Sequence, residues 1–209
     1  MLSVEWSVLV LFIPTFFLVS ATPGMCMTLA LTMGLSIGLR RTFHMMWGEL
    51  IGVGLVALAA VIGVATIMLQ YPRVFEVFKY LGGAYLFYLG IQMWLSKGRM
   101  AIPNNMEEVA DVPRLKLASQ GFVTAVANPK GWAFMVSLLP PFIVTDQPLL
   151  PQLALLLVFI LVIEFICLVL YAAGGRTLRQ FLFNGDNVRL LNRISGSVMM
   201  AVGVWLALQ

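Results

Sequence analysis

The sequence predicts an all-α integral membrane protein with six transmembrane helices, arranged as two inverted three-helix repeats in which helices 1 and 4 are broken. Three observations predict this fold. Of the 209 residues, 61% are hydrophobic and only 11% are charged, whereas a soluble domain carries roughly 25% charged residues. The apolar residues form long runs, and prolines interrupt two of these runs near their centres. Such a chain cannot cover a water-soluble surface, so its apolar side chains must face lipid.

The gaps between charged residues define the spans, because a helix needs roughly 20 apolar residues to cross the hydrocarbon core. The runs lack the alternation of a membrane β-barrel, and helices satisfy their own backbone groups in lipid. The expected spans cover about 5–37, 42–69, 77–95, 117–143, 149–173 and 190–208.

The first half of the chain, about 1–96, holds three of these spans. The apolar run between Glu5 and Arg40 is too long for one straight span. Pro23 interrupts it near the middle, which predicts one broken and tilted helix. The second span ends before Pro72. The third has Lys79 near its start, where a long side chain can reach the membrane–water interface.

A polar loop at 97–116 separates this half from the second half, about 117–209. The loop is too short to form a separate domain, so 1–209 is predicted to be a single transmembrane domain. The fourth span is broken at Asn128-Pro129, the fifth ends at Gly174, and the sixth is uninterrupted.

Basic residues predict the orientation, because they are retained on the cytoplasmic side. The loops after spans one, three and five are rich in Lys and Arg, while the opposite side holds little more than Arg73 and Lys79. The odd-numbered loops, including 97–116, are therefore expected in the cytoplasm, and both termini outside a bacterial cytoplasmic (inner) membrane. The net charge of +4 reflects this topology, and no clustered basic surface predicts nucleic-acid binding.

Two features predict an internal repeat. At an offset of 113, Gly83 aligns with Gly196 and Gly90 with Gly203, in the third and sixth spans. Each half also begins with a broken span. Three spans per half is an odd number, so the halves would be inverted, and interrupted segments in corresponding positions are typical of a transport site at mid-membrane.

The two breaks are the predicted substrate site. A half-helix that starts after a break presents N–H groups with partial positive charge, which could hold a carboxylate. The alternative is that each kink only shapes packing. The residues assigned to substrate binding are Pro23, Gly24, Met25, Asn128, Pro129 and Lys130.

Charged residues inside the spans are expected to face a cavity and to pair, because a charge is costly in lipid. Lys130 would neutralise one of the two acids Glu49 and Glu164, and the other would be free to carry a proton in antiport. The alternative is a structural carboxyl group held neutral by hydrogen bonds. No nucleotide-binding loop, nucleophile elbow or metal motif occurs. We therefore expect no catalytic residues, metal or cofactor, and no enzyme activity.

Two other function classes remain open. Cys26 lies at the first break, which raises the possibility of a thiol–disulfide electron carrier, although Cys167 lies in the fifth span and away from the second break. The chain could also be a membrane subunit without transport activity. Replacing both cysteines with serine would separate the first alternative from an exporter.

The sequence resembles the lysine-exporter (LysE/RhtB) family of amino-acid efflux proteins over nearly its whole length. The resemblance rests on Thr22-Pro23-Gly24, Gly48-Glu49-Leu50-Ile51-Gly52, the Tyr80-LGGAYLFYLG stretch, Asn128-Pro129-Lys130-Gly131-Trp132 and Pro140-Pro141-Phe142. It implies a secondary exporter of neutral or basic amino acids or close analogues, driven by the proton gradient and often dimeric. The family's first break usually reads Pro-Gly-Pro-Asn. Here Met25-Cys26 replaces the last two residues, which bears on the substrate because this loop should touch it.

Overall fold

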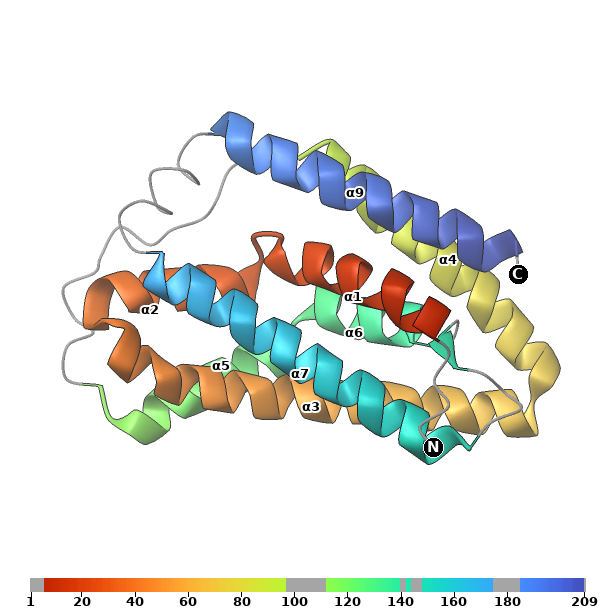
Figure 1. The fold of residues 1–209 in the computed structure, drawn as a ribbon, viewed down its shortest axis with the longest axis horizontal. Helices are drawn as coiled ribbons and strands as arrows, with labels where there is room; N and C mark the ends of the chain where they lie inside the picture. Colours follow the sequence, from red (N-terminus) through yellow and green to blue (C-terminus); the bar gives the residue numbers. More distant parts are fainter. Residues whose placement is uncertain (1–5, 97–111, 140–141, 144–147, 175–184, 209) are drawn as a thin grey trace.

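The computed structural model describes residues 6–96, 112–139, 142–143, 148–174 and 185–208, and these residues form an all-helical bundle, as the sequence predicts (Figure 1). The helices are α1 (Trp6–Ala21), α2 (Met25–Ile37), α3 (Leu39–Gln70), α4 (Pro72–Trp94), α5 (Arg114–Val126), α6 (Pro129–Leu138), α7 (Leu149–Ala173) and α9 (Gly185–Leu208).

The first predicted span is broken where the sequence indicates. Helix α1 ends at Ala21, α2 begins at Met25, and the two axes differ by 57°. Pro23 lies in the break and Gly24 is the N-cap of α2, with an extended backbone. Because proline cannot donate a backbone hydrogen bond and clashes with the preceding turn, a continuous helix is disfavoured here.

The fourth predicted span is also broken. Helix α5 ends at Val126, and α6 begins with Pro129 in its first turn, a position where a missing N–H costs nothing. The Asn128 side chain caps α6 by accepting a hydrogen bond from the Lys130 backbone N–H at 3.1 Å.

Other boundaries differ from the prediction. Helix α4 begins at Pro72 and not near residue 77, because proline is well suited to a first helical turn. Helix α5 begins at Arg114, inside the predicted loop 97–116, and α9 begins at Gly185 and not near 190. The remainder of that loop, 97–111, lies outside the described residues.

Length and composition alone qualify two helical segments of the described chain as membrane spans, Leu39–Gly63 and Leu150–Ala173. The bent pair α1–α2 makes a third. Helices α5 and α6 have 13 and 10 residues, so neither can cross a bilayer alone. Six spans therefore stay a prediction.

Glycines bring three helix pairs into close contact. A methyl group added at Gly48 of α3 would lie 1.8 Å from the Ala118 carbonyl oxygen of α5. A methyl group added at Gly34 of α2 would lie 2.2 Å from the Ala172 carbonyl oxygen of α7.

Helices α4 and α9 also meet through close glycine contacts. A methyl group at Gly90 would lie 2.7 Å from the Gly196 oxygen, and one at Gly203 would lie 2.6 Å from the Gly83 oxygen. Such small residues let backbones approach closely.

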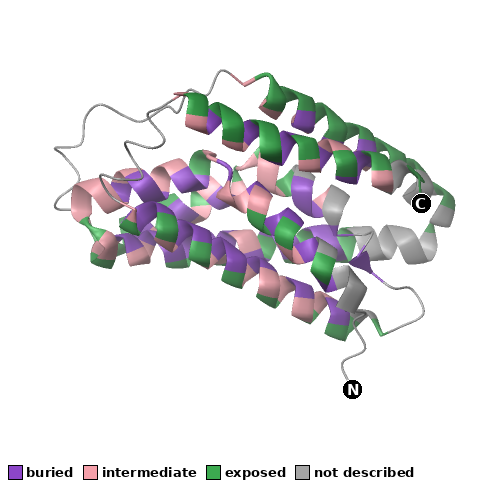
Figure 2. Cartoon of the chain, turned by 45° about the horizontal axis from the view of Figure 1, so that its top comes forward, coloured by how far each residue is buried: buried purple, intermediate pink, exposed green. Residues whose placement is uncertain are grey.

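The bundle has two distinct ends. Helix α1 begins and α9 ends at one end, which we call the terminal end (Figure 1). The turn between α2 and α3 and the start of α5 lie at the opposite end, the loop end. Figure 2 shows exposed residues along the outer faces of α4 and α9, while buried residues gather between the other helices.

Candidate functional site

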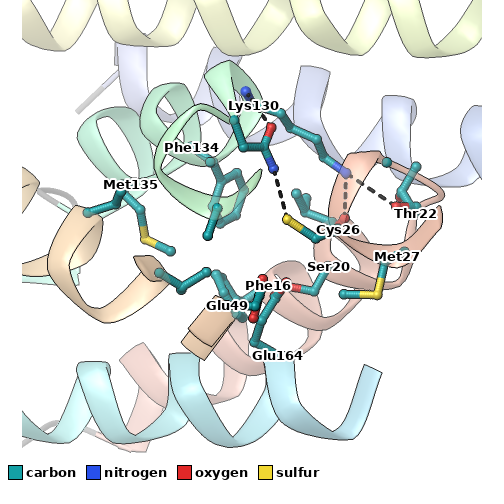
Figure 3. A pocket seen from close by; sticks show the side chains of 17 residues that line it. Phe16, Ser20, Thr22, Cys26, Met27, Glu49, Lys130, Phe134, Met135 and Glu164 are labelled. Atoms are coloured by element: carbon teal, nitrogen blue, oxygen red, sulfur yellow. Dashed lines mark hydrogen bonds between the residues drawn. The ribbon is translucent and has the colours of Figure 1, made fainter. Parts of the chain in front are cut away.

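The two helix breaks lie against each other inside the bundle and border one cavity (Figure 3). Its empty space is about 570 Å³, including the part that opens outward. The breaks and the flanking helices line it with Phe16, Val19, Ser20, Thr22, Gly24, Cys26, Met27, Glu49, Val53, Val56, Ala125, Asn128, Lys130, Gly131, Phe134, Met135 and Glu164.

Lys130 connects the second break to the first. Its Nζ donates to the Val19 carbonyl oxygen at 2.8 Å and to the Thr22 carbonyl oxygen at 3.4 Å. The last carbonyls of a helix have no partner within the helix, and they carry partial negative charge. The buried ammonium group is therefore stabilised by the carbonyl end of α1.

This arrangement bears on the predicted pairing of Lys130 with an acid. We expected Lys130 to neutralise Glu49 or Glu164; its Nζ makes no direct ion pair within the described residues, although Glu164 lies near enough to interact with it electrostatically. The break leaves several carbonyls next to Lys130, and these provide the nearer acceptors.

Helices α7 and α9 bind two further carbonyls at the end of α1. The Tyr171 hydroxyl donates to the Ala21 carbonyl oxygen at 2.7 Å. The Thr22 and Ser195 hydroxyls lie 2.6 Å apart, and both contact the Leu18 carbonyl oxygen. Three other helices, α6, α7 and α9, thus stabilise this break, because unpaired buried carbonyls would be costly.

The first turn of α2 has backbone N–H groups that no described residue accepts. Its N-cap, Gly24, supplies no side-chain hydrogen bond. Within the described residues, no acceptor binds the N–H groups of Met25, Cys26 or Met27, which lie in the first turn. Asn128 crosses the cavity to this turn, and its Nδ2 lies 3.6 Å from the Cys26 sulfur. The positive end of the α2 dipole therefore faces the cavity.

The two predicted acids reach the cavity from α3 and α7. Glu49 is fully buried, and neither of its carboxyl oxygens makes a hydrogen bond to a described residue. Glu164 accepts a hydrogen bond from the Ser20 hydroxyl at 2.7 Å. The two side chains lie side by side in Figure 3. Glu49 is thus a buried acid without a hydrogen bond to a described residue, beside a second acid, in a cavity that also holds a cation and a positive helix end.

The structure brings together most of the residues assigned from sequence, but not all of them. Gly24, Asn128, Lys130, Glu49 and Glu164 line the cavity. Pro23 and Pro129 set the breaks without lining it, and the Met25 side chain is 49% exposed and also absent from the lining.

Sequence reasoning missed Ser20, Phe16 and Phe134 as lining residues. Ser20 had one available signal, because it lies three residues before Pro23, on the turn that leads into the break. No comparable signal marks the two phenylalanines, because aromatic residues are common in the apolar runs.

The two cysteines are free and buried. No group of three or more metal-binding side chains occurs among the described residues.

Comparison with known proteins identifies the family. A family model described as LysE type translocator matches residues 17–209. The chain belongs to this family. The LysE-type translocator is thus a membrane transporter and not an enzyme, and the resemblance predicted from its motifs is confirmed.

Similar proteins come from several bacteria. The homoserine/homoserine lactone efflux protein of Salmonella typhimurium is 28% identical over 190 residues, which cover 91% of each chain. An uncharacterized membrane protein of Vibrio cholerae is 28% identical over 188 residues, 90% of each chain. The membrane protein YrhP of Bacillus subtilis is 24% identical over 205 residues, 94% of this translocator and 96% of the relative. No solved structure matches this translocator.

Proposed function

We propose that this translocator is a secondary exporter of neutral or basic amino acids or close analogues, which it moves across the bacterial cytoplasmic membrane in exchange for protons. The observation that carries the proposal is the cavity between the two helix breaks, where the unpartnered acid Glu49 lies near the free N–H groups of α2. The name of the Salmonella relative, a homoserine/homoserine lactone efflux protein, supports this class of substrate.

An α-amino acid matches the charges of the cavity. Its carboxylate would accept hydrogen bonds from the first turn of α2, at the positive end of that helix. Its ammonium group would lie against Glu49, the acid without a partner. Phe16, Val53, Val56, Phe134 and Met135 would surround the side chain of the substrate.

Exchange with protons would use the same contact between Glu49 and the substrate ammonium group. A buried carboxylate without a partner is costly, so Glu49 is expected to hold either a proton or a substrate ammonium group. Binding of one would then release the other, which couples the two movements. Glu164, next to Glu49 and bound to Ser20, would share in this exchange.

We also propose that the six spans form two inverted repeats. The contacts between α4 and α9 support this arrangement. Gly83 corresponds to Gly196 and Gly90 to Gly203 in the sequence repeat, and the observed contacts are Gly90 with Gly196 and Gly83 with Gly203. A two-fold relation requires such reciprocal contacts, since exchanging the two halves must convert one contact into the other.

The test is efflux of preloaded amino acids from proteoliposomes, with and without a pH gradient, over a panel that includes homoserine, threonine, leucine and lysine. The unaltered protein should export at least one of them faster when a gradient is present. Glu49→Gln should abolish substrate-dependent proton movement, and Glu164→Gln should weaken it.

Asp186→Asn is the matched control, because this carboxyl group is highly exposed and its partner is Arg189, outside the cavity. It should export like the unaltered protein. If both glutamine variants keep gradient-driven export intact, proton coupling through these acids is wrong. If the unaltered protein moves no amino acid of the panel, a membrane subunit without transport activity becomes the better description.

A further inference from the structure

A chain of aromatic rings extends from the cavity toward the terminal end of the bundle. Phe16 of α1 and Phe134 of α6 both line the cavity, and their ring centroids lie 5.5 Å apart. Phe16 stacks on Phe12 at 5.7 Å, and Phe12 meets Phe142 edge to face at 5.1 Å. We call these four residues, Phe134, Phe16, Phe12 and Phe142, the aromatic column.

The column lies on one side of the breaks only. Phe16 precedes the end of α1 by five residues and Phe134 follows the start of α6 by five residues, which puts both rings about 8 Å along their helices from the breaks. Helices α1 and α6 extend from the breaks toward the terminal end (Figure 1). The two rings therefore meet at similar depth, between the cavity and that end.

The column is densely packed. Its four side chains are between 0% and 3% exposed, and the rings present no hydrogen-bonding group. Water and a zwitterion cannot pass between such rings while they remain in contact. The column therefore covers the side of the cavity between α1 and α6 that faces the terminal end.

The loop end of the bundle is packed in a different way. There α2 packs on α7 and α3 packs on α5 through backbone contacts at Gly34 and Gly48. A contact between backbones opens only when whole helices separate. A contact between two rings can open by side-chain rotation together with a small helix movement, so the two sides of the cavity differ in what must move.

We propose that Phe16 and Phe134 form the barrier on the exit side of the cavity, and that the two rings part when a transported solute leaves toward the terminal end. This inference rests on the proposed export function for its direction of transport. The barrier itself is a property of the bundle and can be measured without any substrate.

Cys26 provides the probe, because it lines the cavity, is 5% exposed, and becomes the sole cysteine after Cys167→Ser. In that background, Phe16→Ala and Phe134→Ala are compared with Phe17→Ala. Phe17 is the matched control, since it lies next to Phe16 on α1 but is 39% exposed and outside the column. The reagent is a membrane-impermeant trimethylammonium methanethiosulfonate, added separately to each face of oriented vesicles.

Reagent added at the face that carries the termini should modify Cys26 roughly tenfold faster in Phe16→Ala and Phe134→Ala than in the background protein, because thiol reactivity follows access. Phe17→Ala should react like the background. Equal rates in all four proteins, or an increase only from the opposite face, would overturn the proposal.

Two measurements keep the result interpretable. Size-exclusion chromatography in detergent identifies variants that do not fold, and Phe16→Leu and Phe134→Leu then replace them, because leucine remains apolar but loses the ring contact. Amino-acid efflux is measured on vesicles of the Cys167→Ser background protein, because Phe16 and Phe134 also line the proposed binding cavity. Faster labelling without any efflux would retain the barrier and reject the export function, whereas efflux with unchanged labelling would retain the function and reject the barrier.

Discussion

At the scale of single residues, Lys130 shows how carbonyl oxygens at a helix end can bind a cation inside an apolar bundle. Its ammonium group binds two carbonyl oxygens at the end of α1, where the helix dipole adds to the hydrogen bonds. Neither carboxyl oxygen of Glu49 makes a hydrogen bond to a described residue. The sequence did not decide which acid Lys130 would neutralise, and in our proposal it is Glu49 that binds a proton or a substrate.

Tyr171→Phe tests the network at the end of α1. The variant loses the hydrogen bond to the Ala21 carbonyl and leaves that oxygen unpaired, so we expect it to lower the free energy of unfolding by about 1–3 kcal/mol. Unfolding by denaturing detergent in mixed micelles measures this change. Tyr85→Phe is the control, since Tyr85 is 41% exposed. Equal stability of the two variants would contradict the structural role of the Tyr171 hydroxyl.

Replacing both cysteines tests the redox alternative. The Cys26→Ser, Cys167→Ser protein should keep most of its efflux, because a serine hydroxyl can accept from Asn128 as the sulfur does and no described contact requires a disulfide. The two single variants serve as controls in the same efflux assay. Complete loss of activity in each of the three, with normal folding, would favour a thiol–disulfide carrier.

At the scale of helices, the breaks were predictable because proline acts locally. A proline disfavours a continuous helix, and both breaks occur where Pro23 and Pro129 indicate, although Pro14 lies inside α1 without ending it. Boundaries such as the start of α4 were less predictable, because a proline can also open a helix. The choice between these outcomes depends on packing that the local sequence does not contain.

Gly48→Ala tests the close contact of α3 with α5. The added methyl group would lie 1.8 Å from the Ala118 carbonyl oxygen, so the helices must separate, and we expect a loss of about 1–3 kcal/mol or more in the free energy of unfolding. Gly63→Ala lies on the same helix with no atom within 4 Å of the new methyl group. It should be neutral or stabilising by up to about 1 kcal/mol, because alanine favours helix.

Thermal unfolding in detergent compares the two glycine variants directly. A Gly48→Ala protein as stable as Gly63→Ala would show that α3 and α5 are not in tight contact.

At the scale of the whole molecule, the sequence predicted the charged part of the site better than its apolar part. Glu49, Glu164 and Lys130 stand out because a charge within an apolar run is costly and needs a polar environment. Phe16 and Phe134 do not stand out, since their contact joins helices from opposite halves of the chain and aromatic side chains suit lipid equally well. Only the folded arrangement distinguishes a ring that lines the cavity from one that faces lipid.

The distribution of charge predicts the topology of the bundle. Arg40, Arg41 and Arg114 lie at its loop end, whereas α1 begins and α9 ends at the other. Alkaline phosphatase, which is active only outside the cytoplasm, should therefore be active when fused after Gln209 and inactive when fused within 97–111. A fluorescent protein that folds only in the cytoplasm provides the reverse control. The opposite pattern of activities would invert the orientation.

Because the two breaks are in contact, each half of the polypeptide provides hydrogen-bonding partners for the break in the other half. The first half supplies the carbonyls that hold Lys130, and the second half supplies Lys130 and Asn128. A chain severed between α4 and α5 would leave either fragment with exposed polar backbone that lipid cannot solvate. Each fragment should then accumulate in the membrane only when the cell produces both, because each is stable only when bound to the other.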